Sequence, residues 1–378
     1  MVDFDEYIQQ GEPNKREKSY AWQTAIGLQA VDGLKPSEYL VEMARKHIEG
    51  DITIDEARQL IKSYYDSKES RTEQDNQTEE ADKVSANITK LLSEHSFAFT
   101  LAGLTAVHRR IFEGVFKFAG QIRDYNITKK EWVLCGDTVL YVSAPDIRKA
   151  IEYDLEQEKA FDYTKLNINQ IIARISKFVA GLWQIHPFGE GNTRTTAVFT
   201  IQYLRSMGFN VENDLFAKHS WYFRNALVRA NYQNIKKGIK QESIFLELFF
   251  RNLLLGENNE LKNRYLIVNA PNDFIKTGFP TSTPTSTPTS TPTSTENHLT
   301  IDNDKIIRLI KIIANNRLSI KEMMAAIGLK DRENFMEYSL TPAIKDGFVT
   351  MLYPDKPRHP RQKYLLTVKG MAIFDSLR

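Results

Sequence analysis

The sequence has a single cysteine, Cys135, which excludes an internal disulfide framework and a cysteine-rich zinc site. No apolar run approaches the roughly 20 residues that a membrane helix needs. The acidic, polar first residues show no secretory pattern. Net charge is only +2, which predicts neither a nucleic-acid coat nor an acidic tail. These absences together predict a cytoplasmic protein without membrane contact.

What is present is an ordinary globular composition with one low-complexity stretch. The chain of 378 residues is long enough for two or three domains. Residues 281–295 repeat TSTP, and since proline lacks a donor and Ser/Thr offer no core, they are expected to form an extended tether. We predict a helical region at 1–80, a catalytic domain at 81–260, a linker at 261–298 and a small domain at 299–378.

Apolar periodicity predicts a mainly α-helical fold. Ile168, Ile171, Ile175 and Leu182 recur at helical spacing and predict a buried helix that leads into the segment HPFGEGN. A second apolar helix follows this segment and is expected to stop near Gly208. Residues 122–142 are rich in Val, Leu, Trp and Tyr around Gly-Asp, which predicts a β-hairpin.

The segment between the two helices, residues 186–194, has residue types suited to phosphate chemistry. Gly189 and Gly191 allow backbone N–H groups to face an anion at the positive end of the following helix. Glu190 is a hard oxygen ligand of the kind that Mg²⁺ prefers, and Arg194 supplies a fork of donors for phosphate oxygens. His186 precedes them and can accept a proton from an incoming hydroxyl.

This order resembles the Fic family motif. The resemblance implies a Fic-type helical core and transfer of AMP from ATP to a Ser, Thr or Tyr hydroxyl of a target protein, with Mg²⁺ bound by Glu190. His186 would be the general base, Phe188 an inward anchor, and Asn192 and Arg194 phosphate clamps. The matching residues are His186, Phe188, Glu190, Gly191, Asn192 and Arg194.

The resemblance extends beyond this motif. Residues 118–123, FAGQIR, resemble the stretch before the family's target-docking hairpin, so the segment Lys129–Leu140 would pair with the target by strand addition. Lys129 would also reach the nucleotide. Tyr222 and Asn231 lie where the family contacts the base. Two alternatives stay open: the hairpin is an ordinary exposed one, and Tyr222 and Asn231 pack in the core.

Two positions depart from the family pattern. Thr193 replaces the second glycine and adds a hydroxyl for phosphate or metal, whereas Ala197 replaces the final arginine. Three alternatives follow: AMP transfer with a weaker grip on the triphosphate, transfer of another nucleotide, or lost activity. Transfer of AMP is favoured because His186, Glu190 and Arg194 are kept.

The first 80 residues resemble the small Vbh-type antitoxins that cap Fic enzymes. In those proteins a hydroxyl residue and a later glutamate block the γ-phosphate position; here Leu28 and Asp32 stand at these places. The hypothesis is a built-in cap that contacts Arg194 through Asp32, against the alternative of a purely structural helical pair. Fic proteins cap themselves within and between chains, so the oligomeric state stays open.

Residues 299–378 predict three helices and two strands, a winged helix-turn-helix. This region holds 14 Lys/Arg against 9 Asp/Glu, with a basic cluster in the predicted wing. Its third helix carries acidic residues, which would repel DNA, so DNA binding and protein binding both stay as hypotheses for this region. A catalytically silent DNA- or protein-binding regulator on a Fic scaffold is therefore the alternative to an enzyme. The target protein is not identified by the sequence.

Overall fold

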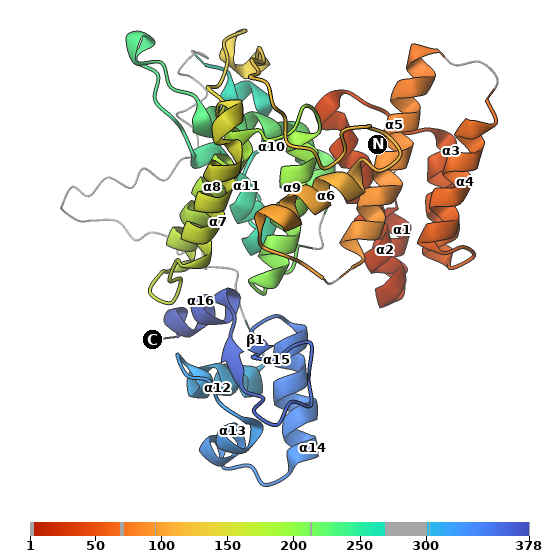
Figure 1. Ribbon diagram of the computed structural model, residues 1–378. Helices are drawn as coiled ribbons and strands as arrows, with labels where there is room; N and C mark the ends of the chain where they lie inside the picture. The colour runs from red at the N-terminus through yellow and green to blue at the C-terminus, as the bar shows by residue number, and fades with distance from the viewer. Residues whose placement is uncertain are drawn as a thin grey trace.

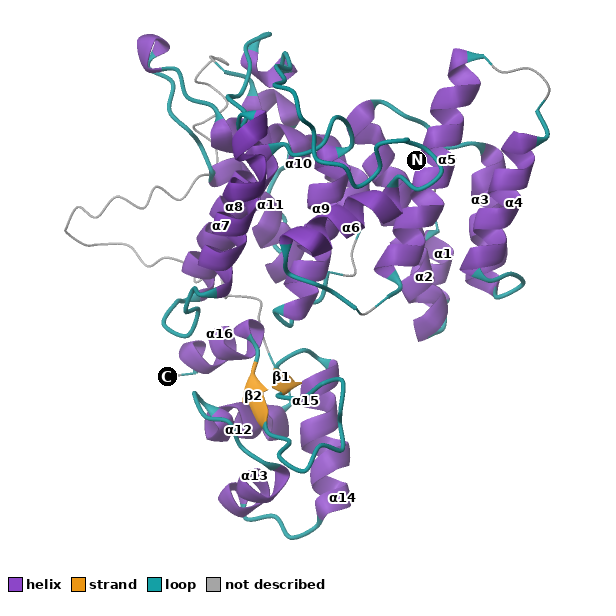
Figure 2. Cartoon of the chain, in the orientation of Figure 1, coloured by secondary structure: helices purple, strands orange, loops and turns teal. Residues whose placement is uncertain are grey.

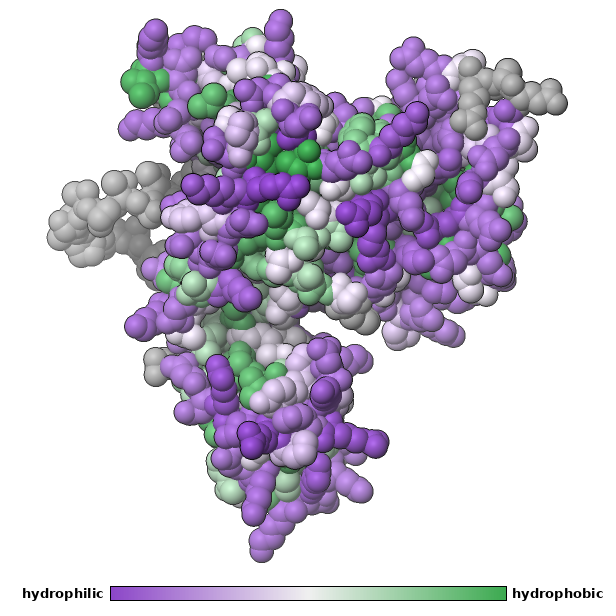
Figure 3. All heavy atoms as spheres, viewed as in Figure 1, coloured by the Kyte–Doolittle hydropathy of each residue, from purple (hydrophilic) through white to green (hydrophobic). Residues whose placement is uncertain are grey.

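The computed structural model describes residues 4–68, 72–94, 96–211, 214–268, 301 and 303–377. The predicted mainly α-helical class is confirmed (Figure 2). Most of the face seen in Figure 3 is hydrophilic, as expected for helices that bury their apolar sides. The α-helices before the C-terminal unit are α1 (Asp5–Gln10), α2 (Pro13–Gly27), α3 (Glu38–Glu49), α4 (Ile54–Asp66), α5 (Glu73–Leu92), α6 (Leu101–Ile111), α7 (Ile147–Lys159), α8 (Ile168–Ile185), α9 (Asn192–Ser206), α10 (Leu215–Asn231) and α11 (Ile244–Leu255).

Short 3₁₀ segments join several of these helices. Their bounds are η1 (Leu28–Asp32), η2 (Trp132–Leu134), η3 (Ala144–Asp146), η4 (Ile235–Lys237) and η5 (Asn263–Leu266).

Helices α1 to α4 form an N-terminal region on one side of the molecule, next to the long helix α5 (Figure 1). Thr53 and Glu56 form a capping box that fixes the start of α4. The buried Asp82 of α5 accepts hydrogen bonds from the Ser37 hydroxyl (2.5 Å) and the Tyr65 hydroxyl (2.7 Å). This carboxylate therefore ties α3 and α4 to the helix that continues into the main core.

Helix α9 lies at the centre of the main core. All of its residues from Asn192 to Leu204 are buried, so the helix is surrounded by other helices rather than amphipathic. The predicted helix before it is α8, which the capping box of Asn167 and Gln170 opens. Helix α9 ends at Ser206, two residues before the predicted stop at Gly208.

The predicted β-hairpin at 122–142 is wrong. This segment contains the 3₁₀ turn η2 and otherwise loop; the flap, as we call residues 129–140, reverses at Cys135 and Gly136 without a strand ladder. The physical reason is burial: Val133 and Leu134, neighbours that a strand would point to opposite faces, both pack into the core.

The main core extends further along the chain than predicted. Leu261 and Leu266 are buried in it, and the N–H of Val268 donates to the carbonyl of Val133 (2.8 Å). Residues 261–268, assigned to the linker from composition, are therefore part of this core. The predicted TSTP tether lies outside the described residues.

The C-terminal unit has its own core and a two-stranded antiparallel sheet, in which Val349 pairs with Leu366. Among the described residues, these are the only strands (Figure 2). The elements match the predicted three helices and two strands, with a π-turn inside the third helix and an added terminal helix. They are α12 (Asp304–Ile313), α13 (Ile320–Ile327), α14 (Arg332–Phe335), the π-turn η7 (Met336–Leu340), α15 (Thr341–Lys345), β1 (Val349–Met351), β2 (Tyr364–Leu366) and α16 (Val368–Ser376).

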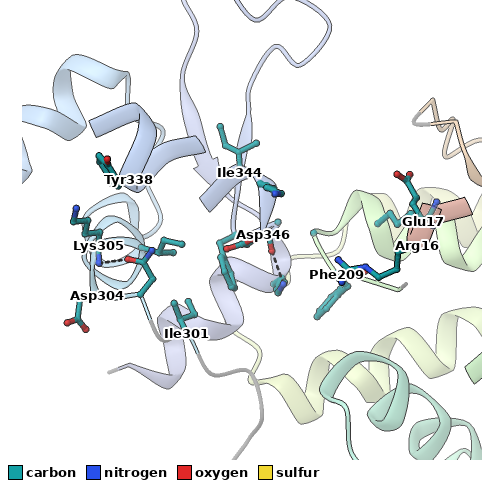
Figure 4. A pocket seen from close by; sticks show the side chains of 18 residues that line it. Arg16, Glu17, Phe209, Ile301, Asp304, Lys305, Tyr338, Ile344 and Asp346 are labelled. Carbon is teal, nitrogen blue, oxygen red and sulfur yellow. Dashed lines mark hydrogen bonds between the residues drawn. The ribbon is translucent and has the colours of Figure 1, made fainter. Parts of the chain in front are cut away.

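This unit meets the main core at the end of α9. The N–H of Lys369 donates to the carbonyl of Met207 (3.2 Å), and Gly208 and Gly347, both at positive φ, bring their backbones together. A Cβ on Gly347 would lie 2.2 Å from the Gly208 carbonyl oxygen, so a side chain there would push the two parts apart. Beside this contact, a cavity of about 1200 Å³ takes its walls from α2, the end of α9 and the C-terminal unit (Figure 4).

Candidate active site

His186 is held in an uncommon backbone conformation at the end of α8. Its φ is +50°, and its N–H donates to the carbonyl of Trp183 (3.1 Å). The buried Arg123 donates from Nε to the His186 carbonyl (2.8 Å) and from its terminal nitrogens to the carbonyls of Tyr125 and Val142, 2.6 Å each. Left-handed backbone costs energy for a non-glycine residue, so Arg123 fixes both this strained turn and the two ends of the flap region.

The imidazole of His186 lies in a dry, aromatic environment. The residue is 3% exposed, with the ring of Tyr141 at 4.3 Å and that of Trp183 at 5.2 Å between centroids. Burial, with the positive charge of Lys129 as a smaller cause, holds its pKa well below 6.5. Neither ring nitrogen has a hydrogen-bond partner among the described residues. The ring is therefore neutral, with a nitrogen available to accept a proton.

Residues 189–194, which we call the cradle, follow His186 and include the first residues of α9. Gly191 caps this helix at φ +74°, where a Cβ would lie 2.1 Å from the ring of Phe112, so only glycine fits. Asn192 accepts from the Phe188 N–H (2.9 Å) and donates to the Phe188 carbonyl (2.7 Å). The predicted clamp Asn192 thus uses its side chain to brace the loop.

His108 of α6 supports the cradle from behind. Its Nδ1 accepts from the Gly120 N–H (2.8 Å), so Nε2 carries the proton and donates to the Glu190 carbonyl (3.1 Å). Its ring stacks on Phe188 at 3.8 Å, which places the predicted anchor in the core. Sequence reasoning missed His108, because a single histidine in an apolar helix has no distinguishing signal.

Burial lowers the pKa of His108 to about 4 and that of His47, which accepts from the Trp22 indole, also to about 4. Unfolded histidines titrate near 6.5, so both rings stabilise the fold above that pH and lose this contribution as the pH falls toward 4. We expect the free energy of unfolding to drop by about 2 kcal/mol between pH 7.5 and 5.5. Urea denaturation at both pH values measures the drop, and His108→Gln should remove part of it. If the free energy of unfolding of that variant fell by as much as in the unmodified protein, His108 would not contribute to the pH dependence.

Arg194 is buried, and three side chains from the N-terminal half hold it. Its terminal nitrogens donate to Gln29 (2.9 Å) and Glu80 (2.7 Å), and its Nε forms an ion pair with Asp32 at 2.8 Å. Its guanidinium also lies 4.8 Å from the ring centre of Phe112. The side chain of Arg194 is 2% exposed, whereas those of Asp32 and Glu80 are 34% and 23% exposed. We call Gln29, Asp32 and Glu80 the Arg194 cage.

Asp32 therefore contacts Arg194, as the sequence hypothesis expected, and the sequence did not indicate Gln29 or Glu80. Helix spacing places Gln29 three residues before Asp32, on the same side of η1. Glu80 comes from α5, so only the tertiary fold brings it to the same guanidinium.

Thr193, which stands where the Fic family pattern has a glycine, has a structural partner. Its hydroxyl oxygen accepts a hydrogen bond from the indole N–H of Trp183 (3.0 Å), and both side chains are buried. Thr193 lies in the first turn of α9 and needs no left-handed backbone.

Replacing Thr193 with valine should destabilise the protein by about 1–3 kcal/mol, because the buried indole N–H would lose its acceptor without a change in side-chain shape. Serine at this position keeps the oxygen and should cost less. Thermal unfolding of the two variants makes the comparison. Equal losses would mean that the hydrogen bond contributes nothing beyond packing.

Glu190 offers the exposed carboxylate of the cradle. It lies 3.3 Å from the amino group of Lys129 in the flap. No group of three or more metal-ligating side chains occurs among the described residues. A single carboxylate fits Mg²⁺ that arrives with substrate phosphates, since this ion keeps several waters and uses one or two protein carboxylates.

Tyr222 and Asn231, predicted to contact a base, are buried and hydrogen-bonded to backbone. The Tyr222 hydroxyl donates to the Phe245 carbonyl (3.2 Å), and the Asn231 amide donates to the carbonyls of Ala180 and Leu227. Ala197 is fully buried within α9. The structure gives these side chains packing roles and does not bring Tyr222 or Asn231 to the cradle surface.

A buried carboxylate connects the flap to the His186 ring. Glu131 is 1% exposed and receives two hydrogen bonds from Arg224, at 2.6 and 3.2 Å. It also accepts from the Tyr141 hydroxyl (3.1 Å), and the ring of Tyr141 covers the imidazole. Arg224, Glu131 and Tyr141 thus hold the cover over His186 in place.

Two regions of the chain match known protein families. Residues 98–204, which contain His186 and the cradle, match the model of the Fic/DOC family. Residues 304–367 match the model of the "Filamentation induced by cAMP protein Fic-like, C-terminal domain". The region that holds His186 and the cradle is a Fic domain.

Two known proteins are similar to parts or all of this chain. The chain is 27% identical over 116 residues to the protein adenylyltransferase VbhT of Bartonella schoenbuchensis, a match that covers 31% of this chain and 23% of VbhT. A crystal structure of a Fic family protein from Desulfovibrio desulfuricans G20 aligns with 96% of this chain and 92% of its own, at 18% identity and a TM-score of 0.42. No helix in the described part of this protein is both long and apolar enough to cross a membrane.

Proposed function

We propose that this protein is a protein adenylyltransferase, which transfers AMP from ATP to a hydroxyl of a target protein. One observation carries the proposal: a neutral imidazole with unpartnered nitrogens ends α8, and a glycine-capped helix start with Arg194 in its first turn follows within eight residues. This arrangement pairs a proton acceptor with a site for phosphate.

His186 would accept the proton of the attacking Ser, Thr or Tyr hydroxyl. The oxygen then forms a bond to the α-phosphorus, and the bond from that phosphorus to the bridging oxygen breaks, so that pyrophosphate leaves. The backbone N–H groups of Gly189 and Gly191, the start of α9 at Asn192 and Thr193, and the guanidinium of Arg194 would hold the phosphates and stabilise the developing charge.

Glu190 would hold Mg²⁺ together with phosphate oxygens, and this ion supplies charge neutralisation. Lys129 pairs with Glu190 and would exchange this contact for one with a phosphate oxygen. Side chains that are 31% and 56% exposed make a weak ion pair, so little free energy opposes that exchange.

The target would dock on the flap. Trp132 is 51% exposed and Leu140 is 84% exposed, so the flap presents apolar side chains outward. Docking through side chains replaces strand addition in our proposal, since the flap has no strand. The covered His186 ring requires Tyr141 to move when a hydroxyl arrives.

The N-terminal region would inhibit this reaction through the Arg194 cage. A guanidinium with two hydrogen bonds and an ion pair to the cage has few donors left for phosphate. Asp32 and Glu80 are partly exposed, so they can withdraw without leaving a buried charge of their own.

A second candidate is a silent Fic scaffold that acts only by binding. The caged Arg194 and the alanine at 197 favour it, because both reduce the positive charge available to a triphosphate. Neither affects His186, and the adenylyltransferase remains the proposal.

Incubation with lysate and ATP labelled at either the α- or the γ-phosphate tests the proposal. AMP transfer predicts label on a protein band from α-labelled ATP and none from γ-labelled ATP. Label from the γ position would indicate a kinase. Absence of label from both, even in a variant with the cage removed, would favour the silent scaffold.

A further inference from the structure

The C-terminal unit carries a groove that the proposed function does not use. It has a volume of about 1270 Å³ and lies between α13, the segment α14–α15 and the loop that joins β1 to β2 (elements in Figure 1). Apolar side chains, each partly buried, form its floor: Ile320, Met324, Met336, Ile344 and Met351. Three of these five are methionines, whose flexible thioethers adapt to different apolar partners.

The charged residues that line this groove are all basic. Lys321, Arg332, Lys345 and Arg358 line it and are exposed, and no Asp or Glu is among its lining residues. Within the described part of the chain, no acidic side chain forms an ion pair with any of the four. A rim of unpaired positive charge around an apolar floor is complementary to a segment with an apolar face and acidic flanks.

We propose that this groove binds an acidic amphipathic segment of a partner protein. Apolar side chains of the segment would enter between the methionines, and its carboxylates would meet Arg332, Lys345 and Arg358 on the rim. Binding would remove the floor from water, and this would supply most of the affinity. The exposed rim would orient the segment and raise the association rate.

One feature favours such a segment over DNA. The groove floor is made of thioethers and aliphatic carbons, which phosphate contacts do not use. The basic loop between β1 and β2 would suit either ligand, but the apolar groove floor beside it suits only an apolar side chain.

Fluorescence anisotropy with the full chain tests this proposal. The probe is a labelled synthetic helix-forming peptide with leucines at i, i+3, i+4 and i+7 and glutamates elsewhere; a peptide with lysines for glutamates and a duplex DNA of mixed sequence serve as comparisons. The acidic peptide should bind most tightly. Met336→Glu should weaken it by about tenfold or more, because it places a carboxylate in the floor.

Arg358→Glu lies in the exposed β1–β2 loop and should keep the fold. It therefore tests the groove even if Met336→Glu unfolds the unit. It should weaken the acidic peptide by about three- to fivefold, and added salt should reduce the difference. Glu337→Gln, next to Met336 but outside the groove, is the matched control and should bind at least as well as the unmodified chain. Tighter binding of the DNA, failure of the acidic peptide to bind, or indifference to Arg358→Glu would overturn the proposal.

Discussion

Neutralising the two acids of the Arg194 cage, in the double variant Asp32→Asn/Glu80→Gln, should tighten Mg-ATP binding by about 10- to 100-fold. Each charge-assisted contact to a buried guanidinium is worth about 1.5–3 kcal/mol, and a phosphate must replace such contacts before it can bind. The rate of AMP transfer at low ATP should rise in proportion. Isothermal titration calorimetry and α-label incorporation measure the two effects.

The same variant should be less stable without nucleotide, because Arg194 is 2% exposed and would lose its countercharges. Mg-ATP should then raise its melting temperature more than it raises that of the unmodified protein. Glu49→Gln is the matched control: it removes an exposed N-terminal carboxylate that pairs with Lys15 at 2.8 Å, away from the cage. If the double variant bound Mg-ATP no better than this control, inhibition through Arg194 would be refuted.

Replacing His186 with alanine should lower AMP transfer by a factor of about 10² to 10⁴, the usual contribution of a general base. The change should be made in the cage-neutralised protein, where the starting rate is highest. Binding of Mg-ATP should be preserved, since the imidazole approaches the hydroxyl rather than the phosphates. The loss should therefore appear in kcat and not in KM for ATP.

His359→Ala provides the control for this experiment, because that histidine lies in the β1–β2 loop of the C-terminal unit. It should transfer AMP at the unmodified rate. Transfer that survived in His186→Ala while the variant stayed folded would exclude His186 as the base and leave the proposed chemistry without its central residue.

The arrangement of His186, Phe188 and Arg194 could be predicted because their spacing is local. Two apolar helices and a glycine-containing turn place these residues within one short segment, and helix periodicity alone locates both helices. The contact of Asp32 with Arg194 was expected only through resemblance, since the two lie 162 positions apart in the chain.

Other parts of the site depend on tertiary contacts that no local pattern records. Glu80 and His108 reach the cradle from α5 and α6, and neither stands in a distinctive motif. The flap was assigned strands because its composition favours them, but burial of Val133 and Leu134 and the Arg224–Glu131 pair override that propensity. The Thr193 hydroxyl, predicted to serve phosphate or metal, accepts a hydrogen bond from Trp183 that no local pattern indicates.

The most direct test of the account is a crystal structure of the cage-neutralised protein with Mg²⁺ and a non-hydrolysable ATP analogue. The account predicts phosphates against the backbone of residues 189–194 and the Arg194 guanidinium, with the imidazole of His186 facing the α-phosphorus. Phosphates bound elsewhere, or an imidazole that remains covered by Tyr141 and turned away from the nucleotide, would contradict it.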